Sequence, residues 1–195
     1  MRNKFRKIVF ILALAVFVFS AWLFLNKRGE TDIVVDAHVP RITVTSSSFE
    51  DLGVMPEKHT GRGADISPDL KLLQVSGHAV SIAVIMDDID IPWAPNYTHW
   101  VIWDIPAADY IPEGIAHGEM VLELNNAKQG IAYGKHMYRG LMPPFGTHRY
   151  MFHVFVLDSF LELDASCSKD ELIKAMDGHI LQYGSLTGWY PKADN

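Results

Sequence analysis

Three acidic residues stand at the end of one apolar run, and a histidine opens the next. Asp87, Asp88 and Asp90 follow the β-branched run at residues 80–86, and His99 begins the run after it. Acids at a strand end are often solvated turn residues, which is the simpler interpretation of this cluster. The alternative is a site in which Asp88 accepts a hydrogen bond from a histidine and fixes its tautomer.

A second polar cluster stands where a loop rich in Pro and Gly leads into a strongly apolar run. His148, Arg149 and Tyr150 open this run, which ends at Leu157. Successive side chains of a strand point to opposite faces, so His148 and Tyr150 share one face and can reach one pocket together. His153 shares the other face with Arg149, and its apolar neighbours predict a packed, hydrogen-bonded core histidine.

Both segments resemble signature regions of the phosphatidylethanolamine-binding protein family, which includes the bacterial Raf kinase inhibitor-like proteins. Residues 86–92, with the downstream His99, resemble the Asp-x-Asp-Ala-Pro element of the family. Residues 138–150 resemble its Tyr-x-Gly-Pro-x-Pro-Pro-x-Gly-x-His-Arg-Tyr element. The likeness covers about residues 41–190. Two long motifs in matching order and spacing are far more specific than one short pattern.

The resemblance implies both a fold class and a site. The fold would be mainly β, an antiparallel β-sandwich with a C-terminal helix and a small surface pocket that holds an anion or a phospho-headgroup. Carried over position by position, the ligand-binding residues would be Asp88, Asp90, Pro92, His99, Tyr138, Gly140, Pro143, Gly146, His148 and Tyr150. Tyr138 and Gly140 would shape the loop of the pocket. The resemblance implies no catalytic residue, no bound metal and no cofactor.

The residue types at these positions fit an anion site. The rings of His99 and His148 can each donate an N–H to an anion, more strongly when protonated, and Tyr150 offers a neutral hydroxyl. Gly146 lets the backbone approach a ligand closely. The chain departs from the family pattern at Asp65, Leu72, Ile89, Ile91, Asp104 and Leu141. The two isoleucines beside the pocket favour a more apolar ligand.

The elements that would position these residues are short strands and one late helix. Strand-like runs occur at residues 41–45, 70–75, 80–86, 99–105, 150–157 and 186–190. Ser168 and Glu171 form a capping box, after which apolar residues recur at helical spacing. Because Gly184 stands where a C-terminal cap would fall, the helix is predicted to reach about residue 182. The stretch 107–147 is long for a loop, and loops of this length are usually functional.

The first 28 residues predict a membrane anchor. Residues 8–25 are an 18-residue run without charge, preceded by four basic residues and followed by Lys27 and Arg28. Such a run nearly spans a bilayer as a transmembrane helix, and the basic residues before it place the N-terminus in the cytoplasm. A cleaved signal peptide ending near residue 20 is the alternative, and a buried core helix is a third interpretation.

This interpretation divides the chain into an anchor or signal-anchor at 1–28, a linker at 29–40 and a binding domain at 41–195. The domain would lie outside the cytoplasm, in the periplasm if the cell is Gram-negative. Without residues 1–28, the chain holds 17 − 6 = 11 basic and 23 acidic side chains, a formal charge of −12. Such a domain is a poor partner for nucleic acid, so a bound anion must be held by a local site.

The sequence therefore predicts non-enzymatic binding of a small anionic or phospho-ligand by a membrane-tethered extracytoplasmic domain. A protein-interaction module that inhibits a protease or another partner enzyme is the first alternative. A hydrolase using Asp88 and His99 is the second. A zinc site at Asp88, His99 and His148 is the third, although no short-spaced ligand pair supports it. The single cysteine, Cys167, excludes an intramolecular disulfide.

Overall fold

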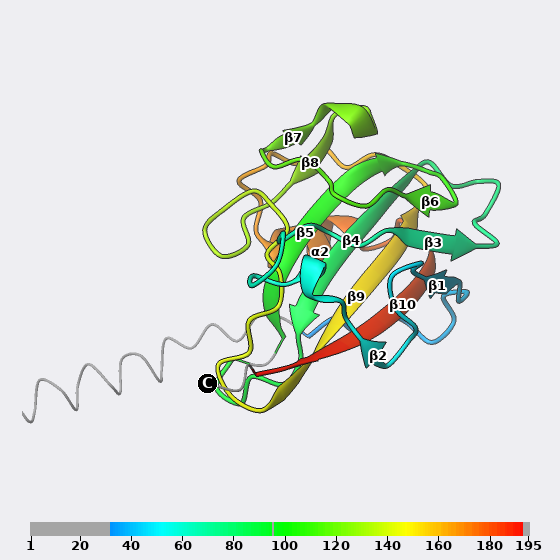
Figure 1. The fold of residues 1–195 in the computed structure, drawn as a ribbon. Coiled ribbons are helices and arrows are strands. Elements are labelled where there is room, and N and C mark those ends of the chain that lie inside the picture. Colours follow the sequence, from blue (N-terminus) through cyan, green and yellow to red (C-terminus); the bar gives the residue numbers. More distant parts are fainter. Residues whose placement is uncertain (1–31, 95, 193–195) are drawn as a thin grey trace, which may run out of the picture.

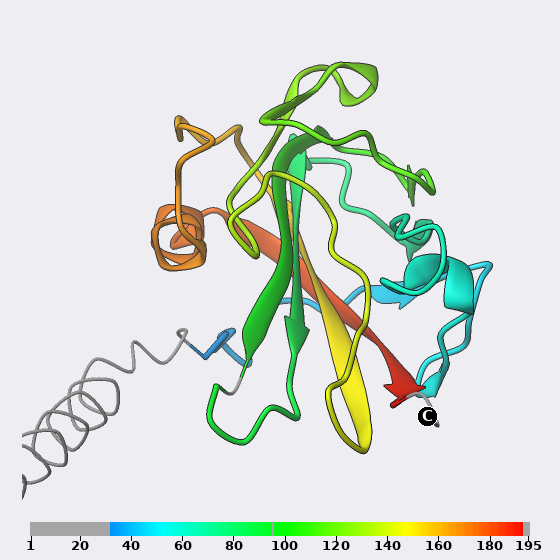
Figure 2. The ribbon, with the colours of Figure 1, turned by 60° about the vertical axis from the view of Figure 1, so that its left-hand side comes forward.

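The computed structural model describes residues 32–94 and 96–192, which form two β-sheets and one α-helix (Figure 1). One apolar cluster lies between the two sheets, and a second lies between the larger sheet and the helix. Figure 2 shows the larger sheet nearly edge-on, with the helix on one side and the smaller sheet on the other. The larger sheet is therefore covered on both faces.

The larger sheet has seven strands. Their order is β2 (Gly53–Val54), β10 (Ile180–Pro191), β9 (Thr147–Leu157), β4 (Ser81–Asp88), β5 (Tyr97–Pro106), β8 (Ala127–Gln129) and β7 (Met120–Val121). Neighbouring strands are antiparallel, except that β2 runs parallel to β10. Strand β4 lies between β9 and β5 and is antiparallel to both. The last residues of β4 therefore lie beside the first residues of β5 and of β9, although these segments are far apart in the sequence.

The smaller sheet is antiparallel and has the order β1 (Thr43–Thr45), β3 (Leu70–Leu73) and β6 (Tyr110–Ile111). Two 3-10 helices, η1 (Glu57–His59) and η2 (Leu122–Leu124), lie in the connections. The cluster between the sheets joins Val44 and Leu72 of the smaller sheet to Met86 and Phe152 of the larger. This arrangement confirms the predicted mainly β fold, and the predicted stretch 107–147 contains β6, β7, β8 and η2.

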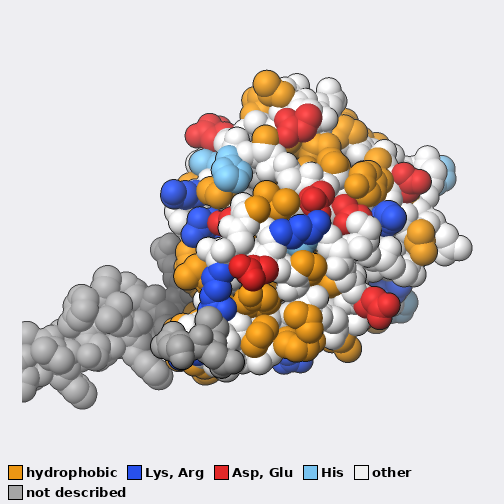
Figure 3. All heavy atoms as spheres, viewed as in Figure 1, with side chains coloured by type: hydrophobic (Ala, Val, Ile, Leu, Met, Phe, Trp, Pro, Cys, Tyr) orange, Lys and Arg blue, Asp and Glu red, His pale blue; other side chains and the backbone are white. Residues whose placement is uncertain are grey.

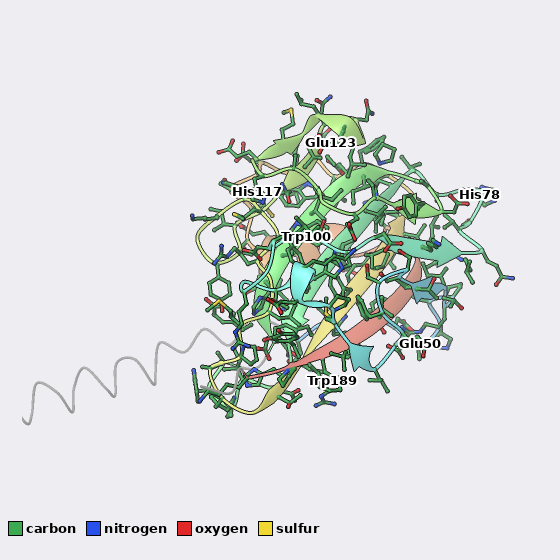
Figure 4. The ribbon with its side chains drawn as sticks, viewed as in Figure 1. Glu50, His78, Trp100, His117, Glu123 and Trp189 are labelled. Carbon is green, nitrogen blue, oxygen red and sulfur yellow. The ribbon has the colours of Figure 1, made fainter. Side chains whose placement is uncertain are left out.

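Strand β4 is buried on both faces, which explains its unbroken apolar sequence. Val84 and Met86 contribute to the cluster between the sheets, while Ala83 and Ile85 contribute to the cluster under the helix. In the neighbouring β5, Trp100 lies in the interior (Figure 4) and donates its indole N–H to Gln129 Oε1 at 2.8 Å. The predicted strands at 80–86, 99–105 and 150–157 are confirmed as β4, β5 and β9.

The helix α2 (Lys169–Met176) begins as predicted and ends earlier. Ser168 is the N-cap, and the capping box with Glu171 is complete. The prediction that the helix reaches residue 182 is wrong, because Gly178 takes a left-handed φ of +80° and β10 begins at Ile180. Gly184 lies inside that strand, where an added Cβ would stand 2.6 Å from the carbonyl oxygen of Ile42. It permits a close backbone approach.

The prediction of an N-terminal transmembrane helix is not supported and is corrected. Within residues 32–94 and 96–192, no helix is long and apolar enough to cross a bilayer. The one α-helix among these residues, α2, has eight residues, whereas a spanning helix requires roughly 20 apolar residues. Residues 8–25, on which that prediction rested, lie outside the described residues.

Candidate functional site

The predicted site residues come together at one end of the central strands of the larger sheet, where β4 ends and β5 and β9 begin. Asp88 is paired in register with Tyr97 of β5 on one side and with Tyr150 of β9 on the other. Figures 1 and 2 show the β4–β5 connection and the loop before β9 at this same end of the molecule. Asp88, His99, His148 and Tyr150 form the centre of the arrangement and are named here the Asp88 site.

Asp88 is the acceptor that orients two of its neighbours. His148 Nδ1 lies 2.7 Å from Asp88 Oδ2, and both side chains are only 2% exposed. The other oxygen, Oδ1, accepts the backbone N–H of Asp90 at 3.0 Å. Burial raises the pKa of Tyr150, and the charge of Asp88 and a hydrogen bond to it act in the same direction. The carboxylate of Asp88 is thus already surrounded by donors from the protein.

His99 is fixed by the backbone of the loop before β9. Its Nδ1 lies 2.9 Å from the carbonyl oxygen of Arg139, and its ring packs edge-on against Tyr150 with centroids 5.1 Å apart. Burial lowers the pKa of His99, and the hydrogen bond to Arg139 only partly opposes this effect. A register shift in the β4–β5 pairing, between Met86 and Asp87, sets two residues of β5 against one of β4. Such a bulge re-aims a side chain, which here brings His99 to the Tyr150 face.

The Nε2 atoms of both histidines are buried, and no hydrogen-bond partner for either lies within the part of the chain that the structure describes. Buried polar atoms are nearly always hydrogen-bonded in folded proteins, and each exception requires a reason. Leaving such an atom unsatisfied costs about 1–3 kcal/mol. Two such atoms lie beside one carboxylate and one phenol, so the Asp88 site is the candidate ligand site.

Tyr138 and Gly140 shape the loop before β9, the role that the resemblance implied. The buried Tyr138 hydroxyl donates to the carbonyl oxygen of His59 at 2.8 Å, and burial raises the pKa of Tyr138. The backbone N–H of Gly140 donates to Asp65, whose other oxygen lies 3.2 Å from Arg139 Nη1. Asp65, a departure from the family pattern, therefore holds the backbone segment that orients His99.

Asp90 is turned toward Arg149 rather than toward the histidines. Arg149 donates to it from Nε at 2.9 Å, from Nη2 at 2.7 Å and from its backbone N–H at 2.8 Å. Hydrogen bonds from Arg149 are the main cause of the lowered pKa of Asp90. Asp90 thus fastens the β4–β5 connection to β9, a role that sequence reasoning missed because it left Arg149 out of the site.

The remaining predicted residues lie in the two loops. Pro92 is exposed and Pro143 is buried, while Gly146 is exposed at a left-handed φ of +56°. The carbonyl oxygen of Gly146 accepts the backbone N–H of Lys192 at 2.6 Å. These residues define the backbone of the rim.

The family model for phosphatidylethanolamine-binding proteins matches residues 45–191, three quarters of the chain. The chain belongs to the phosphatidylethanolamine-binding protein family. It is 39% identical over 150 residues to a UPF0098 protein of Pyrococcus abyssi, a match that covers 75% of this chain and 84% of that protein. A UPF0098 protein of Pyrococcus horikoshii is 40% identical over 150 residues, with 75% of each chain covered.

Two solved structures show the family fold. A putative phosphatidylethanolamine-binding protein homologue from Chlamydia trachomatis is 30% identical, with a TM-score of 0.70 over 78% of this chain and 99% of that one. YbcL of E. coli, described as a member of the mammalian family, is 24% identical, with a TM-score of 0.68 over 79% of this chain and 99% of that one. Members of the family bind small ligands and in general are not enzymes.

An aromatic rim surrounds the site in this family member. Phe145 packs against His148 with ring centroids 4.8 Å apart, and Trp93 packs against Phe145 at 5.3 Å. Tyr133 packs against His99 at 5.0 Å. Met142 in the same loop is 57% exposed and Trp93 is 56% exposed. The sequence signal was available, since these apolar residues stand in loops rich in Pro and Gly, but it was not used.

Asp87 and His153 belong to the opposite face of the sheet. Lys169 Nζ of α2 lies 2.7 Å from Asp87 Oδ2, and Thr98 donates to Oδ1 at 2.9 Å. His153 Nδ1 lies 2.7 Å from the Tyr183 hydroxyl, and burial lowers the pKa of His153 to about 3. His153 is thus a buried, hydrogen-bonded core histidine, as predicted.

The part of the chain that the structure describes supports no metal site, and a groove that it contains lies away from the Asp88 site. Among the described residues, no group of three or more His, Cys, Asp or Glu is placed to hold a metal ion. A groove of about 270 Å³ lies between residues 33–35 and α2, lined mainly by apolar side chains such as Phe155 and Ile173. Phe155 belongs to the cluster under the helix, so this groove lies on the α2 side of the sheet.

Proposed function

We propose that this protein binds a small anionic or phospho-ligand at the Asp88 site without chemical turnover. The observation that carries the proposal is the pair of buried Nε2 atoms, on His99 and His148, beside Asp88 and Tyr150. A ligand that reaches them would satisfy two polar atoms that the fold leaves unsatisfied, and the rim of Phe145 and Trp93 would cover its organic part. Membership of a family of small-ligand binders supports the same conclusion.

The electrostatics require a local site. The acidic chain opposes anions as a whole, with a formal charge of −6 over its full length. On the face in Figure 3, acidic and basic side chains are interspersed rather than gathered into one basic patch. The ligand must therefore be held by hydrogen bonds at short range, in the partly desolvated surroundings where such bonds are strongest.

The test is calorimetric titration of the purified full chain with inorganic phosphate and phosphoethanolamine at pH 6 and pH 8. We expect saturable binding that is stronger at pH 6 and is lost in the double variant His99→Ala/His148→Ala. His153→Gln, a histidine change on the opposite face of the sheet, is the matched control and should bind normally. Absence of binding by the folded protein at both pH values would refute the proposal.

A protein-interaction module that inhibits a protease or another enzyme is the second candidate function. The exposed rim residues Trp93, Met142 and Phe145 favour it, because aromatic side chains and Met are enriched at protein interfaces. Crosslinking in cells, followed by loss of the crosslinked product in Trp93→Ala/Phe145→Ala, tests this candidate. The hydrolase alternative with Asp88 and His99 as a pair has no support in the geometry, because Asp88 pairs with His148 and His99 pairs with a carbonyl oxygen.

The extracytoplasmic location stays a prediction, because it depends on residues 1–28, which lie outside the described residues. The location is tested by a fusion protein in which a reporter follows residue 195. The reporter is one that is active only outside the cytoplasm. Activity of the reporter would support the predicted location, and activity equal to that of a leaderless control would refute it.

A further inference from the structure

Four large apolar side chains stand exposed around the mouth of the Asp88 site and are named here the rim patch. They are Trp93, Tyr133, Met142 and Phe145, each between 37% and 57% exposed. Trp93 and Phe145 pack against each other with ring centroids 5.3 Å apart, so these two form one continuous surface. A cluster of exposed apolar side chains marks a surface that a protein partner or a membrane covers.

The loops that carry the rim patch have little negative charge, although the chain as a whole is acidic. Residues 91–94 and 140–146 contain no charged side chain. The neighbouring carboxylate of Asp90 is paired with Arg149 at 2.7 Å. Lys192 is exposed and lies beside the second of these loops, because its backbone N–H donates to a carbonyl oxygen there. A surface of negative charge therefore meets little repulsion at this end of the molecule.

The described part of the chain begins at the same end of the molecule. The side chain of Asn96, in the β4–β5 connection, donates to Asp32, the first described residue, and Figure 2 shows this start of the chain beside that connection. Asn96 stands three residues after Trp93. Only residues 26–31 separate Asp32 from the uncharged run 8–25, and a chain of that length spans at most about 25 Å. The apolar run therefore ends within reach of the rim patch.

We propose that the rim patch docks on the surface of a lipid bilayer, the same bilayer into which residues 8–25 partition. The run need not cross the bilayer for this, because lying in its interface is enough. The rings of Trp and Tyr are amphipathic and prefer the level of the lipid headgroups. A protein partner would fit the residue types of the patch equally well, but it gives no reason for an apolar run at the same end. This inference goes beyond the proposed function and needs no ligand at the Asp88 site.

Quenching of tryptophan fluorescence by brominated lipid tests the inference. The full chain is incorporated into vesicles of phosphatidylcholine, either unmodified or brominated near the top of its acyl chains. Every protein carries Trp22→Phe, so that no tryptophan remains in the run 8–25. Trp100 and Trp103 lie in the interior of the domain, whereas Trp93 is exposed. We expect a loss of emission in the brominated vesicles, and we expect Trp93→Phe to abolish that loss.

The matched control moves the exposed tryptophan to the other end of β9. Phe160 follows that end of the strand and is 51% exposed, so Phe160→Trp in the Trp93→Phe protein should report no loss of emission. Equal emission of Trp93 in the two kinds of vesicle would overturn the inference, as would a protein that the vesicles do not retain. Quenching of the Phe160→Trp protein as strong as that of Trp93 would also overturn it. The calorimetric test of the proposed function is separate, so either proposal can fail alone.

Discussion

Replacing Gly140 with alanine is a direct test of how the loop before β9 builds the site. An added Cβ would stand 2.5 Å from the carbonyl oxygen of His59 and 2.6 Å from Asp65 Oδ1. Ordinary contact begins at 3.4 Å, so the neighbours must move by about 0.9 Å, and one of them is backbone. Overpacking of this kind costs about 1–3 kcal/mol. The displaced segment includes the Arg139 carbonyl oxygen that orients His99.

The assay for Gly140→Ala is thermal and denaturant unfolding of the purified chain, with phosphate titration on the same samples. We expect a midpoint roughly 2–12 °C lower, since 1 kcal/mol corresponds to about 2–4 °C for a chain of this size. The matched control is Gly77→Ala, because a Cβ at Gly77 meets nothing within 4 Å. A change of less than about 0.5 kcal/mol in Gly140→Ala would refute the reasoning, because that is the ordinary effect of an unconstrained surface substitution.

Three further predictions concern the ionisable groups. Stability should fall as the pH drops below 6.5: burial lowers the pKa values of His59, His99 and His153, so the unfolded chain binds more protons in this window. For His153 the loss of stability continues down to about pH 3. The free energy of unfolding of His153→Gln, measured in urea, should therefore depend less on pH than that of the wild type. An unchanged pH dependence would contradict the assignment of this loss to His153. Lys169→Met removes the cation 2.7 Å from the buried Asp87 and should cost about 3–5 kcal/mol in urea unfolding, part of which Asp87→Asn restores. Arg149→Ala, by contrast, should change stability by less than about 1 kcal/mol, because that side chain is 54% exposed; a larger loss would mean that the pair with Asp90 is better shielded than its exposure indicates.

Patterns within short segments predicted much of the fold. The continuous β-branched run of β4 requires burial on both faces, whichever elements supply that burial. The capping box at Ser168 and Glu171 likewise depends on residues three apart, and the structure contains it. The predicted C-terminal end of α2 was wrong, because the apolar residues after Gly178 fit the spacing of a helix and that of a strand equally well. Pairing of β10 with β9 over most of its length decides for the strand.

The site shows the same division between local pattern and three-dimensional pairing. The spacing of His148 and Tyr150 placed both on one face of a strand, and both border Asp88. Alternation alone would set His99 on the opposite face from its neighbour Trp100. The bulge in the β4–β5 pairing overrides that alternation. No pattern in the sequence of β5 announces an extra residue that arises only from its register with β4.

The sequence by itself determined the family, the mainly β class and the residue types that gather where β4 ends and β5 and β9 begin. These follow from motifs and from the two-residue period of strands. Only the tertiary structure decided the partner of each polar group. It turned Asp90 toward Arg149, gave Asp88 to His148 and placed the Arg139 carbonyl oxygen against His99. Hydrogen bonds depend on distances of about 3 Å between segments far apart in the chain, such as Tyr138 and His59, which are 79 residues apart. Such distances are set by strand register and loop packing, which a linear pattern does not contain.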